Sequence, residues 1–183
     1  MSPAKKLAIV IVLQFLVLFS VLAFKQYTVW TSETVLLKLQ PADLRDFPRA
    51  NDATVEYEIS RLDRTSIAWD ESAGTCCGMP VYVELQKQDD GLWKAIAAHD
   101  SHTHTVDGTV LIKGRAQGEY LYQGQTVSVY YGIEDVFVPE GSASQLPTGR
   151  DHTIAVEVKV DRFGNATPRH FVVDGQQVDL SRR

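Results

Sequence analysis

The sequence predicts an all-β domain, a small antiparallel barrel or sandwich, that follows a single N-terminal transmembrane helix. Two observations favour this fold class. Residues 7–24 form one long apolar run, and the chain after Lys25 alternates short β-rich segments with turns containing Gly, Asn and Asp. After Lys25 no amphipathic helix of three turns is predicted, so the remaining chain has the pattern of a domain built from strands.

The apolar run at residues 7–24 reads LAIVIVLQFLVLFSVLAF. As a helix it would be about 27 Å long, close to the ~30 Å hydrocarbon core of a bilayer. A cleaved signal peptide is the alternative, with Lys5 and Lys6 as its basic start and Val21-Leu22-Ala23 as its cleavage site. The run exceeds the ~7–15 apolar residues of a signal core, so an uncleaved anchor is favoured.

Charges at the two ends of this run predict its orientation. Lys5 and Lys6 precede the run and Lys25 follows it, so the positive-inside rule places the N-terminus in the cytoplasm. We therefore expect a single-pass protein of the inner (cytoplasmic) membrane with an extracytoplasmic C-terminal domain. Its expected parts are a cytoplasmic tail at 1–6, an anchor at 7–24, a connector at 25–32 and an exported β-rich domain at 33–183.

The exported part is acidic. Residues 1–25 hold three of the 18 Lys and Arg residues and none of the 23 Asp and Glu residues, so the rest of the chain has a net charge of −8. A domain of this charge is not expected to bind nucleic acid or an anionic lipid surface through general electrostatics.

Eight segments combine β-branched or aromatic residues with partial alternation of apolar and polar positions, as strands do. Asp90-Gly91 predicts a hairpin turn, and Asp174-Gly175 predicts a last turn near the C-terminus. Short helical turns are expected at residues 41–46 and 60–64. The expected strands are 34–39, 53–59, 81–86 paired with 92–98, 109–113, 126–131, 154–160 and 169–173.

Several strings, in this order along the chain, carry a resemblance to a known family. They are Pro41, Asp43, Arg45 and Asp46; VYVELQKQDDGLWK at residues 81–94; VLIKGR at 110–115; and YGIEDVFVPEG at 131–141. Together they resemble the bacterial GDYXXLXY family of membrane-anchored proteins. The eight positions of the naming motif correspond to residues 50–57, where Tyr57 is identical and Val55 is a conservative replacement.

The resemblance implies an N-terminal membrane anchor, a β-rich exported domain and a polytopic membrane protein as partner. It brings no catalytic residues with it. The sequence itself contains no G-x-S-x-G elbow, no H-E-x-x-H motif and no Gly-rich phosphate loop, so we expect a non-enzymatic accessory or interaction module. A hydrolase with an unrecognised site is the third class considered.

The segment 131–141 is the best candidate for a binding loop. Its carboxylates could act as oxygen ligands or as an acid–base pair, or they could bond to backbone amides while Phe137 fills the core. No calcium-loop spacing is present, and the structural interpretation is favoured. The candidate residues are Tyr131, Gly132, Glu134, Asp135, Phe137, Pro139 and Glu140.

A Cu or Zn site is the alternative function. Cys76 and Cys77 are adjacent, which is too close for an unstrained disulfide, and thiolates and imidazoles are ligands that both metals accept. His99, His102 and His104 lie about one strand pair further along the chain. The simpler interpretation is that these residues lie in two polar loops without forming a site. No cofactor is therefore expected. The metal candidates are Cys76, Cys77, His102 and His104.

Overall fold

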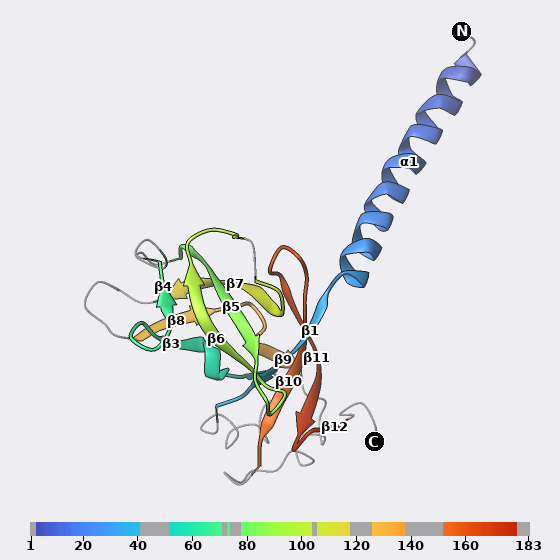
Figure 1. Cartoon of the computed structure of the whole chain (residues 1–183). Helices are drawn as coiled ribbons and strands as arrows, with labels where there is room; N and C mark the ends of the chain where they lie inside the picture. The colour runs from blue at the N-terminus through green and yellow to red at the C-terminus, as the bar shows by residue number, and fades with distance from the viewer. Residues whose placement is uncertain are drawn as a thin grey trace. The chain divides into compact units, whose positions relative to one another are not determined.

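The computed structural model describes residues 3–40, 52–70, 73, 78–103, 106–117, 126–137 and 152–178. The chain divides into two compact units, Met1–Ser32 and Glu33–Arg183, which are described separately. The second unit is mostly β, as the sequence predicts. Figure 1 shows the elements in chain order.

The first unit is one helix, α1 (Pro3–Trp30). Proline suits the first helical position because it has no N–H to satisfy there, and its fixed φ is already helical. The helix runs past the apolar segment through residues 25–30, so most of the expected connector is helical. Of the residues that the structure describes, none form a helix that meets both the length and the hydropathy needed to cross a membrane.

Four antiparallel strands form one sheet of the second unit, in the order β1-β10-β11-β12. The alternating segment 154–160 is strand β10, with the predicted bounds. A turn at Asp174 and Gly175, both with positive φ, joins the last two strands as predicted. The bounds are β1 (Glu33–Lys38), β10 (Ile154–Val160), β11 (Ala166–Val173) and β12 (Gln176–Val178).

Six strands form a second, larger sheet, in the order β3-β8-β7-β5-β6-β4. The predicted hairpin is present between β5 and β6, with Gly91 at a φ of 82° in its turn. One pair departs from the antiparallel expectation, because two residues of β4 run parallel to β6. The bounds are β3 (Arg61–Asp63), β8 (Thr126–Tyr130), β7 (Thr109–Gln117), β5 (Pro80–Lys87), β6 (Trp93–His99) and β4 (Ala68–Trp69).

The predictions for residues 53–64 were wrong in detail. The expected strand 53–59 is reduced to β2 (Asp52–Thr54), which pairs with β9 (Asp135–Phe137). A 3-10 turn, η3 (Glu58–Ser60), follows, and β3 occupies the expected helical turn at 60–64. The chain changes partner here, from β9 to a bridge between Tyr57 and Leu39 and then to β8, and such long-range pairing leaves no local pattern. The other expected helical turn, at 41–46, lies outside the described residues.

Both sheets contribute to one hydrophobic core. Its fully buried members alternate along their strands with side chains that face away, which is the period-two pattern of a half-buried strand. From the four-stranded sheet come Val35, Leu37, Val156 and Val158; from the six-stranded sheet come Val81, Val83, Leu85, Ile112 and Val127.

Candidate functional site

The predicted binding loop begins with a turn at residues 131–135 whose central acid points inward. Glu134 is buried, with 5% of its surface exposed. One carboxylate oxygen accepts the backbone N–H of Tyr131 at 2.6 Å, and the other accepts that of Ile133 at 2.9 Å. Gly132, between these two donors, has a φ of 79°, which favours glycine. Glu134 therefore holds its own turn closed through charge-assisted hydrogen bonds.

Two buried tyrosines tie this turn to the segment 57–59. The Tyr57 hydroxyl donates to the carbonyl of Ile133 at 2.9 Å, and the Tyr131 hydroxyl donates to the carbonyl of Ile59 at 2.8 Å. The backbone N–H of Val55 also donates to the carbonyl of Glu134. These reciprocal bonds join two stretches that lie more than 70 residues apart in sequence.

Burial changes the acid–base behaviour of both tyrosines. It raises the pKa of Tyr57 and that of Tyr131 well above the ordinary phenol value, and the nearby negative charge of Glu134 raises both further. Neither hydroxyl is therefore suited to act as a proton-transfer group near neutral pH.

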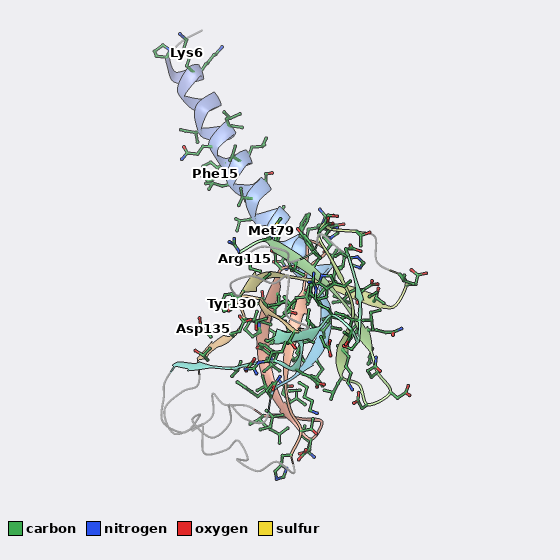
Figure 2. All side chains as sticks on the ribbon, turned by 90° about the vertical axis from the view of Figure 1, so that its left-hand side faces the viewer. Lys6, Phe15, Met79, Arg115, Tyr130 and Asp135 are labelled. Carbon is green, nitrogen blue, oxygen red and sulfur yellow. The ribbon has the colours of Figure 1, made fainter. Side chains whose placement is uncertain are left out.

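The exposed side of the turn carries Asp135, the one acid of the described part of the loop that faces solvent. One of its oxygens accepts the Thr54 hydroxyl at 3.3 Å, and the other lies 3.4 Å from the Tyr130 hydroxyl. The carboxylate raises the pKa of Tyr130. Figure 2 shows Arg115, Tyr130 and Asp135 along one side of the β-domain.

The rest of the predicted loop is described only in part. The backbone of Phe137 ends β9, where it pairs with Asp52. The predicted role of its side chain, and the candidates Pro139 and Glu140, lie outside what the structure describes.

Two of the histidines considered for the metal site have other partners. Nε2 of His102 lies 2.9 Å from the carbonyl of Arg162, and its ring meets the ring of Tyr82 edge-on. The ring nitrogens of His99 lie 3.0 Å from Asp70 and 3.3 Å from Glu84. Cys76, Cys77 and His104 lie outside the described residues, and within the described ranges no three His, Cys, Asp or Glu side chains converge to hold a metal ion.

The pair of His99 and Glu84 belongs to a polar network that the sequence analysis missed. Glu84 lies on β5 between His99 on β6 and Thr109 on β7, whose hydroxyl donates to it at 2.6 Å. Burial acts to raise the pKa of Glu84, but the bonds from Thr109 and His99 outweigh it and lower that pKa. In the sequence, the one indication of this network is a single glutamate among the alternating residues of β5.

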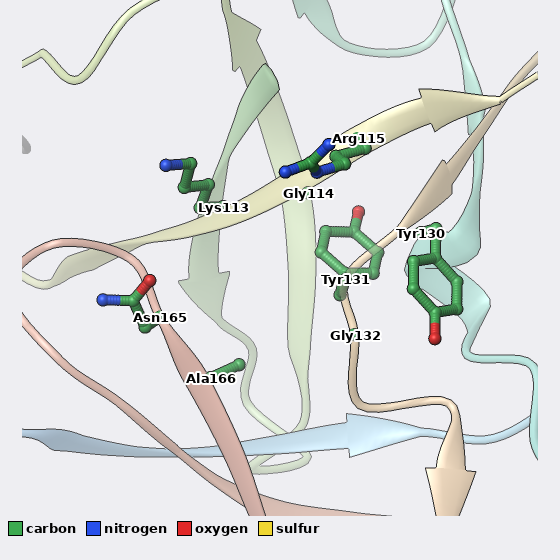
Figure 3. Close-up of a pocket in the computed structure, with 8 residues that line it drawn as sticks. All are labelled: Lys113, Gly114, Arg115, Tyr130, Tyr131, Gly132, Asn165 and Ala166. Atoms are coloured by element: carbon green, nitrogen blue, oxygen red, sulfur yellow. The ribbon is translucent and has the colours of Figure 1, made fainter. Parts of the chain in front are cut away.

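Two open cavities flank Tyr130, each of about 320 Å³. One contains Glu56 and Arg61, which form a bidentate ion pair with each other, together with Glu134. The other lies where β8 separates from β7 (Figure 3), and we call it the 113–115 pocket. Its walls are formed by Lys113, Gly114, Arg115, Tyr130, Tyr131, Gly132, Asn165 and Ala166.

Comparison with known families matches residues 14–171 to the GDYXXLXY protein family, which is most of the chain. The chain belongs to the GDYXXLXY family. No curated protein and no solved structure matches it.

The membership in the GDYXXLXY family draws attention to Val55 and Tyr57. By the resemblance described above, Val55 and Tyr57 correspond to the last two defined positions of the naming motif, and both are buried in the core. Both also bond to the 131–135 turn, Val55 through its backbone and Tyr57 through its hydroxyl. Val55 and Tyr57 therefore help to hold the 131–135 turn in place.

Proposed function

We propose that this protein is a membrane-anchored accessory module whose β-domain contacts a membrane-protein partner outside the cytoplasm. One observation carries the proposal: the large apolar side chains described between Ile11 and Leu22 are all exposed, by 45–69%. Successive helical residues are ~100° apart, so this run covers every side of α1. A helix that is apolar all round is typical of a bilayer span or a protein core, because water solvates it poorly.

The length of the link supports a role close to the membrane. Helix α1 ends at Trp30 and strand β1 begins at Glu33, so two residues join them. At ~3.5 Å per residue this link is short, so an anchored domain stays close to the bilayer surface.

We also infer that the β-domain is a sandwich and not a closed barrel. Each of the two larger sheets has an open strand order, with β1 and β12 at the edges of one and β3 and β4 at the edges of the other. The two sheets share a core, which is the arrangement of a sandwich.

Topology is tested with fusions to the C-terminus in a bacterial host. A fusion to alkaline phosphatase, which folds outside the cytoplasm, should be active. A fusion to a fluorescent protein that becomes fluorescent only in the cytoplasm should be dark. Mass spectrometry of the purified chain should find the N-terminus intact. A chain shortened after Ala23 would identify a cleaved signal peptide and contradict the anchor.

The partner surface is tested by site-specific photocrosslinking in intact membranes. A photoreactive residue at Asp135 lies on the exposed side of the 131–135 turn, and one at Asp89 in the β5–β6 hairpin serves as the control. We expect one discrete, membrane-dependent adduct from Asp135 and none from Asp89. Equal adducts from both positions, or none from Asp135, would exclude this turn as the contact surface.

A further inference from the structure

The 113–115 pocket lies at the point where two strands of the six-stranded sheet separate. Arg115 is opposite Tyr130, and this is the last pair of β7 with β8 at this end. Beyond it, Tyr131 and Gly132 lead away from β7. The other wall is formed by Asn165 and by Ala166 at the start of β11. In the turn before this strand, the carbonyl of Gly164 accepts the backbone N–H of Lys113 at 2.8 Å. The pocket is thus an opening between the two sheets, in contact with both.

Gly114 allows one wall of this pocket to pack closely against β7. A Cβ atom at Gly114 would lie 2.4 Å from a methyl carbon of Val129 and 3.0 Å from the ring of Tyr131. Because Gly114 has no side chain, the Tyr131 ring can pack against β7 and form part of the pocket wall (Figure 3).

Two cations line this pocket without a described acidic partner. Lys113 and Arg115 are two residues apart on β7, so both lie on the same, exposed face of the strand. Among the described residues, no ion pair involves either of them. The Lys113 ammonium lies 5.7 Å from the ring centre of Tyr82, which does not neutralise its charge. Within the described ranges these two charges are therefore not balanced by an ion pair, although the chain after Lys25 has a net charge of −8.

Two acids in the segments that line the pocket accept hydrogen bonds within their own turns. Asp161, in the turn that leads to Asn165, accepts the backbone N–H groups of Phe163 and Asn165 and the side-chain amide of Asn165. Glu134 accepts two backbone N–H groups of its own turn. In the neighbouring cavity, by contrast, Arg61 is paired with Glu56. Counting the described lining residues, the 113–115 pocket therefore has two cations and no acid, while in the adjacent cavity the arginine is paired with a glutamate.

We propose that the 113–115 pocket is a binding site for an oxyanion, with a phosphate group as the best match. The planar Arg115 guanidinium presents parallel N–H donors to two oxygens, and the Lys113 ammonium adds a point charge. Phosphate offers more acceptor oxygens and more negative charge than a carboxylate, which suits two adjacent cations. The phosphate can belong to a lipid headgroup or to a soluble phosphate ester. All residues of the pocket lie in the β-domain, so the proposal is independent of the anchor.

The test is isothermal titration of the full chain, in micelles of a neutral maltoside detergent, with inorganic phosphate at constant ionic strength. We expect saturable binding with one site per chain. Arg115→Gln and Lys113→Gln should each weaken it by about tenfold or more, as expected for loss of a charge-assisted hydrogen bond. Arg115→Lys keeps the charge without the planar donors and should give an intermediate affinity. Lys87→Gln removes the same charge from an exposed position at the end of β5, away from the pocket, and should leave binding unchanged.

Short-chain lipids added to the micelles identify the source of the phosphate. If phosphatidylglycerol competes with inorganic phosphate and phosphatidylcholine does not, the site accepts an anionic headgroup; if neither competes, the site is selective for soluble phosphate. The proposal is overturned if the unmodified chain shows no saturable binding. It is also overturned if Lys87→Gln weakens binding as much as Arg115→Gln, because the effect would then be one of net charge.

Discussion

Single residues decide how the 131–135 turn is held, and Glu134 has the largest part. Its buried carboxylate accepts two backbone N–H groups, and Glu134→Gln replaces one acceptor oxygen by an amide that donates. We expect the free energy of unfolding to fall by about 2–3 kcal/mol, as for loss of a buried hydrogen bond to a charged group. Urea denaturation of the full chain in neutral detergent measures this. Asp135→Asn, on the exposed side of the same turn, is the matched control and should change stability by less than about 0.5 kcal/mol.

The buried tyrosines predict a loss of stability in alkaline solution. Folding raises the pKa of Tyr57 and of Tyr131, so the folded state holds these protons more tightly than the unfolded chain does. Their contribution is complete below the unfolded pKa of ~10 and decreases as pH rises beyond it, by up to about 1.4 kcal/mol per pH unit for each tyrosine. Denaturation at several pH values should show this slope, and Tyr131→Phe should reduce it. An equal slope in both proteins would contradict the assignment.

At the scale of the strands, the first prediction concerns the packing of β7 against β8. Gly114 allows β7 and β8 to approach, because a Cβ there would overlap Val129. We expect Gly114→Ala to lower the free energy of unfolding by about 2 kcal/mol through overpacking. The second change Val129→Ala should recover part of this loss, so that the double variant is more stable than the sum of the single effects predicts. Strict additivity in a denaturation cycle would show that the two positions do not collide.

The network around Glu84 joins strands β5, β6 and β7, and it should make the stability of the fold sensitive to acid. The bonds from Thr109 and His99 lower the pKa of Glu84, so their stabilising effect is present above the ordinary glutamate pKa and is lost as pH falls through the lowered one. Thr109→Val removes one of these bonds. We expect the pKa of Glu84, measured by carbon NMR, to rise and acid unfolding to begin at a higher pH. Thr126→Val, an exposed threonine of β8, should change neither.

At the scale of the whole molecule, the prediction concerns attachment to membranes. Arginine near the middle of a span costs ~2.5–3.5 kcal/mol, so Leu16→Arg combined with Phe19→Arg should displace the helix from the bilayer. We expect the unmodified chain to resist extraction by alkaline carbonate and the double variant to be released. Gln14→Leu, which makes the same run more apolar, should stay in the membrane fraction. Release of the unmodified chain would contradict an integral anchor.

Local patterns predicted most of the strands and the placement of the turns. Period-two alternation located β10 to the residue, and Asp-Gly pairs located the turns between β5 and β6 and between β11 and β12. The segment 52–63 was predicted poorly because its conformation depends on three different partners. The candidate loop was found from its glycine and acids, and carboxylates that bond to backbone amides were part of the favoured interpretation, but which acid makes these bonds was not predicted. Nothing in the string IED distinguishes an inward Glu134 from an outward Asp135.

The sequence by itself determined the apolar run, the β-rich remainder and membership in the GDYXXLXY family, because composition, period and motif order are local properties of the chain. Only the tertiary structure decided which polar groups are hydrogen-bonded within the fold and which are not. It placed Glu134 against backbone amides, Glu84 between His99 and Thr109, and Lys113 and Arg115 at an opening between two sheets. The physical reason is the same in each case. The partners of these groups are set by strand pairing and packing between segments far apart in the chain.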